Sequence, residues 1–148
     1  MIKIICIGRI KEKYFVDAIK EYQKRLTKYI QLEIIELPDY NYDDVKTLYE
    51  EGKNIMSKIK NNDYVVTLDI NGKELSSPEL AGFIDNNISK NLVFIIGGSY
   101  GLSDDVKQRS NYSLSFSKLT FPHQMFRLIL LEQIYRAFKI INNESYHK

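Results

Sequence analysis

The chain has 148 residues, enough for one domain with its own core, and its 44% apolar and 27% charged residues are ordinary for a soluble globular protein. No apolar run approaches the roughly 20 residues that a membrane span needs. The start, MIKIICIGRI, is typical of a strand and not of a signal peptide. A lone Cys6 inside that strand excludes an internal disulfide and predicts a buried thiol. We expect a cytoplasmic protein with a single domain over 1–148.

The charges are distributed unevenly along the chain. Residues 1–30 hold eight basic and three acidic side chains, residues 36–85 hold five and eleven, and residues 106–148 hold seven and two. Basic ends around an acidic middle suit a protein that presents one basic face to a polyanion such as nucleic acid. The same distribution also fits solvated helix faces without a partner, and charge alone leaves both interpretations open.

In the first half of the chain, short apolar runs alternate with segments in which apolar residues recur every three or four positions. The runs predict strands and the periodic segments predict helices. The third strand is expected to end at the Asn71-Gly72 turn. In chain order, the expected elements are a strand at 2–7, a helix at 14–29, a strand at 32–37, a helix at 45–59 and a strand at 64–70.

The second half continues the same alternation. Ser77 is expected to cap a helix that has Pro78 at its first position and Glu79 in its first turn. Ser103 is expected to cap a short helix. The other expected elements are a strand at 92–96, a strand at 112–117 and a long helix at 123–141.

Five strands alternating with five helices predict an α/β fold with a mostly parallel sheet flanked by helices on both faces. Ligands of such sheets bind at the carboxyl ends of the strands. This rule selects the loops after Leu68, Ile96 and Phe116 as the places to look for a site.

The last helix carries a further indication. The segment MFRLILLEQIYRAF is apolar nearly all the way round between Met125 and Leu131. Such a helix is buried on two sides, whereas a chain of this length has one core. We therefore expect a symmetric dimer with this helix in the interface.

Several kinds of site are disfavoured by the spacing of residues. Two histidines and one cysteine, far apart, predict no metal site. A nucleophile elbow for a Ser-His-Asp triad is absent. In VFIIGGSYGLS, residues 93–103, the glycines match neither a P-loop nor the dinucleotide fingerprint. This loop could contact a ligand or simply form a tight turn, and its spacing does not decide between them.

Five segments together indicate a family. They are KIICIGRIKEKYFVDAIKEYQKRL, VTLDINGKELSS, IGGSYGLS, LSFSKLTFPHQMFRLILLEQIYRAFKI and the terminal YHK. In this order, over essentially the whole chain, the sequence closely resembles the RlmH family of SPOUT-class RNA methyltransferases. The resemblance implies a SPOUT-type α/β fold with a C-terminal deep trefoil knot, a homodimer, and S-adenosyl-L-methionine as cofactor. It also implies methylation of N3 of pseudouridine 1915 in 23S rRNA, on the assembled ribosome.

The resemblance also implies the cofactor-binding residues, which follow the same three strand ends that the parallel-sheet rule selects. S-adenosylmethionine carries no phosphate, so it needs an apolar slot and nearby main-chain groups but no P-loop lysine. The residues carried over are Leu68, Gly97, Phe116, Ser117, Lys118, Leu119, Thr120 and Phe121.

The tail and the last helix hold the candidates for catalysis. Because the N3–H of pseudouridine is weakly acidic, the enzyme must remove this proton or stabilise the anion, and histidine is the side chain that titrates near neutral pH. The expected catalytic residues are His147, Tyr146 and Glu132, with the tail completing the site across the dimer, as the resemblance implies. The alternatives are a frayed tail and an ordinary i, i+4 ion pair between Glu132 and Arg136.

Contacts to RNA are expected from basic residues at both ends of the chain. The candidates are Lys148, Arg136, Arg9 and Lys11, and a solvated loop is the alternative for the last two. His123, which follows Pro122, could bind a ligand or cap its helix. Two other functions compete with the methyltransferase: a non-enzymatic ribosome-associated binding protein with the same fold, and a small flavin- or nucleotide-binding domain that would bind FMN.

Overall fold

A computed structural model describes all residues, 1–148, and contains one five-stranded sheet. The strand order is β2-β1-β4-β3-β5 and every pairing is parallel. The predicted α/β class with a parallel sheet is therefore confirmed. The strands are β1 (Ile2–Ile7), β2 (Leu32–Leu37), β3 (Tyr64–Glu74), β4 (Leu92–Ile96) and β5 (Tyr112–Ser115).

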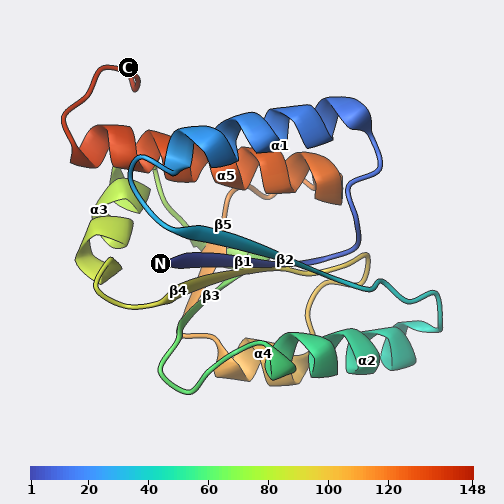
Figure 1. Ribbon diagram of the computed structural model, residues 1–148. Coiled ribbons are helices and arrows are strands. Elements are labelled where there is room, and N and C mark those ends of the chain that lie inside the picture. Colours follow the sequence, from blue (N-terminus) through green and yellow to red (C-terminus); the bar gives the residue numbers. More distant parts are fainter.

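Helices cover both faces of the sheet (Figure 1). On one face lie α1 (Lys13–Leu26), α3 (Ser77–Asn87) and α5 (His123–Ile141), and on the other lie α2 (Asp44–Ser57) and α4 (Asp104–Arg109). Alternate residues of β1 enter two separate cores: Ile4 packs under the first group and Ile5 under the second. Cys6 is buried in the first core, as predicted, and burial raises the pKa of its thiol to about 12.

The helix starts agree with the predicted caps, with one correction. Ser103 caps α4 as expected, because its side chain accepts from the Val106 N–H. The cap of α3 is Ser76 and not Ser77. The Ser76 hydroxyl accepts from the Glu79 N–H, and the Glu79 carboxylate accepts from the Ser76 N–H at 2.8 Å. This reciprocal pair is a capping box, which places the first turn one residue earlier than expected.

The third strand is longer than predicted. It continues through Gly72 to Glu74 instead of ending at the turn, and its register shifts so that Leu68 and Lys73 both pair with Leu114. A Cβ at Gly72 would lie 2.8 Å from the backbone of Leu114. The glycine therefore allows β3 to bulge and then return close to β5, and the Asn-Gly pair marks this bulge and not the strand end.

The long helix α5 packs against α1 on one side and α3 on the other. Residues such as Leu130, Leu131 and Ile134 face the core, whereas Met125 is 38% exposed and Leu128 and Ile129 are half-buried. The side of α5 that the protomer leaves open is thus partly apolar, as the sequence suggested. No helix in the structure combines the length and the hydropathy that crossing a membrane would take. The trefoil knot stays a prediction from the resemblance.

Candidate active site

A cavity of about 700 Å³ opens where β3, β4 and β5 end. Its walls come from the ends of these strands, from the loops that follow them, and from the first turn of α5. This is the edge at which a parallel sheet binds ligands. The volume lies within the range of sites for small molecules and cofactors.

Seven of the eight predicted cofactor residues line this cavity. They are Leu68, Gly97, Phe116, Ser117, Leu119, Thr120 and Phe121. Lys118 is the exception, because it faces a neighbouring hollow together with Ile70 and Glu74. Three loops that are far apart in sequence are therefore brought to one place.

The glycine loop forms a tight turn and also lines the cavity. Gly101 adopts φ +83° and donates its N–H to the Gly98 carbonyl at 3.0 Å. A Cβ at Gly97 would lie 2.5 Å from the Gly101 oxygen and 2.9 Å from Leu102. Only glycine at position 97 lets the two sides of the turn approach so closely. The two interpretations of this loop are compatible.

The loop after β5 is held in shape by its own hydroxyl groups. The Ser115 hydroxyl donates to the Ser117 carbonyl at 3.1 Å, and the Ser117 hydroxyl accepts from the Leu119 N–H at 3.0 Å. Phe116 and Phe121 pack on Phe126 with ring centroids 5.3 Å and 6.1 Å apart. The result is a fixed loop with an aromatic wall.

Glu51 lies beneath the glycine loop and was not found by sequence reasoning. Its side chain, on α2, is only 3% exposed, and one carboxylate oxygen accepts from the Tyr40 N–H at 3.2 Å. The other oxygen has no hydrogen-bond partner and would be 2.8 Å from a Cβ at Gly98. Burial, with a smaller contribution from Asp39, raises the pKa of Glu51 above its ordinary value.

The buried Glu51 carboxylate predicts a specific pH dependence of stability. Because the folded-state pKa lies above the unfolded value, the native protein binds the proton more tightly, and stability falls as pH rises above about 4.5. Glu51→Gln removes this loss, and we expect a gain on the order of 1 kcal/mol at neutral pH. Urea unfolding from pH 4.5 to 7.5 measures it, with exposed Glu33→Gln as control. A Glu51→Gln variant no more stable than wild type at pH 7.5 would contradict the assignment.

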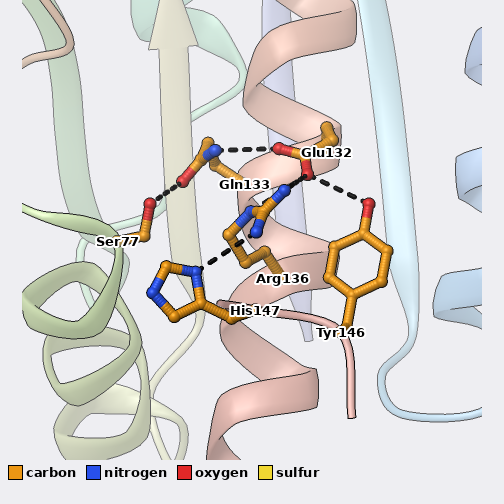
Figure 2. Close-up of polar contacts among 6 residues, drawn as sticks. All are labelled: Ser77, Glu132, Gln133, Arg136, Tyr146 and His147. Atoms are coloured by element: carbon orange, nitrogen blue, oxygen red, sulfur yellow. Dashed lines mark hydrogen bonds and ion pairs between the residues drawn. The ribbon is translucent and has the colours of Figure 1, made fainter.

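The predicted catalytic residues gather at a second place, shown in Figure 2. One oxygen of Glu132 accepts from Arg136 at 2.6 Å and from the Tyr146 hydroxyl at 3.0 Å. Arg136 also contacts Nδ1 of His147 at 3.2 Å. Glu132 and Arg136 thus form the expected ion pair, but the pair also holds the tail. Burial, and then hydrogen bonds with Tyr22 and Glu132, raise the pKa of Tyr146, so its phenol stays protonated.

The tail is anchored a second time just before these residues. The Glu144 carboxylate accepts from the Tyr29 hydroxyl at 2.8 Å and from Lys139 at 3.1 Å. These contacts, Tyr29 first, lower the pKa of Glu144. Two separate anchors mean that the tail is ordered against α1 and α5 and is not frayed.

The basic residues predicted to contact RNA fall into two groups. Arg136 and the exposed Lys148 belong to the tail region, whereas Arg9 and Lys11 are exposed in the loop between β1 and α1. This loop is tied to the start of α5: the Lys11 N–H donates to the Gln124 side chain at 2.9 Å. It therefore lies beside the helix turn that lines the cavity, far along α5 from Arg136.

A buried arginine on α5 also holds the loop between β1 and α1. Arg127 is 5% exposed, forms a 2.5 Å ion pair with Glu36, and donates to the Gly8 carbonyl at 3.1 Å. His123, for which the sequence left open a ligand role or a helix cap, lines the cavity and does not cap α5, whose N-cap is Pro122. No group of three or more His, Cys, Asp or Glu side chains is placed to hold a metal ion.

The parallel α/β fold has a ligand-sized cavity at its strand ends, and comparison with known protein families identifies the class to which it belongs. A family model described as "Predicted SPOUT methyltransferase" matches residues 1–147, and the chain belongs to this family. A solved structure, a probable methylase family protein from Haemophilus influenzae Rd KW20, superposes with a TM-score of 0.56 at 15% identity. The superposition covers 96% of this chain and 66% of the H. influenzae chain, and it supports the fold alone.

Curated relatives narrow the class. A ribosomal RNA large subunit methyltransferase H from Clostridium botulinum (strain Alaska E43 / Type E3) is 55% identical, and the match covers 99% of each chain. A putative ribosomal RNA large subunit methyltransferase H from Methanococcus vannielii is 57% identical with the same coverage. Within the SPOUT methyltransferases, the chain belongs to the RlmH family.

Proposed function

We propose that the protein, acting as one domain over 1–148, methylates N3 of pseudouridine 1915 in 23S rRNA on the assembled ribosome in the cytoplasm, with S-adenosylmethionine as cofactor. The names of the relatives support an activity on large-subunit ribosomal RNA. The observation that carries the proposal is the cavity in which Leu68, Gly97 and the 116–121 loop meet.

The residues present fit the proposed cofactor. Gly97 leaves bare backbone at the cavity wall where a Cβ would not fit. Phe116, Leu119 and Phe121 supply apolar and aromatic surface suited to an adenine ring. When bound, S-adenosylmethionine would supply an electrophilic methyl group. The protein would hold it and exclude water from its apolar parts.

His147 has a defined orientation for its part in the reaction. Because Arg136 can only donate hydrogen bonds, Nδ1 of a neutral His147 accepts, and Nε2 carries the hydrogen. That Nε2–H would donate to a carbonyl oxygen of the base and stabilise the negative charge that remains when N3 loses its proton. Tyr146 would position the tail through Glu132, since its raised pKa keeps the phenol protonated and unable to accept the N3 proton.

The proposed active form is a homodimer in which one chain's tail serves the other chain's cavity. Within one chain, Arg136 lies ten residues beyond Phe126 on α5, which is about 15 Å along a helix. Met125, Leu128 and Ile129 provide the partly apolar surface for an α5–α5 interface. A two-fold axis there would carry the tail toward the start of the partner helix. Arg9, Lys11 and Lys148 would then contact the rRNA backbone.

Calorimetry with two ligands tests the cofactor assignment. We expect S-adenosylmethionine to bind and FMN to give no heat, because the cavity offers no phosphate-binding loop of the P-loop kind. Binding of FMN alone would favour a flavin-binding domain and refute the proposal. A protein that binds ribosomes but neither ligand would be the non-enzymatic alternative.

A further inference from the structure

A second, smaller cavity of about 240 Å³ lies between α3 and α5. It shares Leu114, Phe116 and Phe121 with the larger cavity, so the two spaces adjoin at these residues. The rest of its lining is Leu75, Ser76, Ser77, Leu80, Ile129 and Gln133. A space of this size, below the range for whole cofactors, suits a single flat ring.

The side-chain amide of Gln133 is the polar group that α5 contributes to this small cavity, and its orientation is fixed. Its nitrogen donates to a Glu132 oxygen at 2.8 Å, and its oxygen accepts from the Ser77 hydroxyl at 2.6 Å (Figure 2). Because a carboxylate can only accept, the nitrogen must face Glu132. An amide oxygen accepts twice and an amide nitrogen donates twice. One acceptor position on the oxygen and one donor position on the nitrogen of Gln133 therefore remain unused.

We propose that the small cavity receives the target base and that Gln133 distinguishes pseudouridine from uridine, an inference that rests on the proposed function. Pseudouridine is joined to its ribose through carbon, so N1 keeps its hydrogen beside the C2 carbonyl. In uridine, N1 carries the ribose and has no hydrogen. The neighbouring N1–H and C2=O match the unused acceptor and donor of Gln133, and N3 stays unobstructed on the other side of the carbonyl.

The rest of the cavity is suited to this role. Phe116 and Phe121 can stack on a flat ring, as aromatic side chains do with unstacked bases. Leu80 and Ile129 exclude water, which strengthens a hydrogen bond made to the amide. The shared wall places the base beside the cofactor cavity. A site built to hydrogen-bond a substrate N–H rejects an analogue that lacks it, since the buried partner is left unpaired.

Rates on two matched substrates test the inference. The probes are ribosomes that carry either pseudouridine or uridine at the target position, and the variant is Gln133→Met, which keeps the volume but loses the amide. We expect kcat/KM on pseudouridine to fall about 10- to 100-fold, the cost of 1–3 kcal/mol for an unpaired polar group. The rate on uridine should change little, so the preference for pseudouridine collapses.

Controls separate this inference from the function on which it rests. Gln108→Met, at an exposed position of α4, should keep the wild-type preference. Gln133→Met should bind S-adenosylmethionine as wild type does, and Ser77→Ala, which frees the amide, should weaken the preference in the same direction. An unchanged preference in Gln133→Met overturns the inference alone. Failure of the wild-type protein to methylate either ribosome overturns the proposed function, and the inference with it.

Discussion

Alanine at Gly97 should weaken binding of S-adenosylmethionine by roughly 10- to 100-fold, because a small-to-large change at a closely packed position costs about 1–3 kcal/mol. The added Cβ would lie 2.5 Å from the Gly101 oxygen and 2.8 Å from its carbonyl carbon. Both are backbone atoms, so the whole turn must move away from the cavity. Isothermal titration calorimetry measures the change.

Gly82→Ala is the matched control for this prediction. A Cβ at Gly82 would meet nothing within 4 Å, and the residue lies within α3. Alanine there should leave cofactor binding unchanged and stabilise the helix by up to about 1 kcal/mol. Leu119→Glu tests the same cavity without stressing the fold, since Leu119 is 71% exposed, and it should also weaken binding. Wild-type affinity in both Gly97→Ala and Leu119→Glu would exclude this cavity as the cofactor site.

Removal of the His147 ring should lower turnover about 10²- to 10⁴-fold, the usual contribution of a positioned acid–base or charge-stabilising group. Binding of S-adenosylmethionine should not change, because the proposed cofactor contacts come from the cavity lining, which does not include His147, whereas His147 would contact the target base. Single-turnover methylation of ribosomes by His147→Ala measures the first effect and calorimetry the second. Weaker cofactor binding with normal turnover would mean that the role of His147 is misplaced.

A mixture of two inactive variants tests whether the tail acts across the dimer. The assay uses a cofactor concentration that fills the wild-type cavity but not that of Gly97→Ala, so this variant lacks a working cavity and His147→Ala lacks a working tail. If the tail of one chain serves the cavity of the other, mixed dimers contain one intact site and recover activity. If each chain uses its own tail, the mixture stays inactive, and that result would contradict the shared site.

The fold was predictable because its signals are local. Apolar runs, helical periodicity and N-cap residues together predicted all ten elements, and Ser103 caps its helix as expected. The two errors have different causes, the first a tertiary contact and the second a local capping box that begins one residue before the predicted cap. Gly72 is in a bulge because β5 passes directly over it, and Ser76 caps α3 because Glu79 reaches back to its N–H.

The site was predictable only in part. The parallel-sheet rule and the family resemblance located the three loops, and the structure joins them in one cavity with Lys118 left outside. Glu51 and Gln133 carry no signal in the sequence. Their surroundings are set by tertiary contacts: the glycine turn at Gly98 packs against the Glu51 carboxylate, and Ser77 of α3 donates to the Gln133 amide.

The central claim is best tested by mass spectrometry of 23S rRNA from a strain that lacks the protein. The proposed function predicts that the N3-methyl group on pseudouridine 1915 is lost, that the wild-type protein restores it, and that His147→Ala restores it poorly. Complete methylation at this position in the deletion strain would contradict the assignment of the substrate.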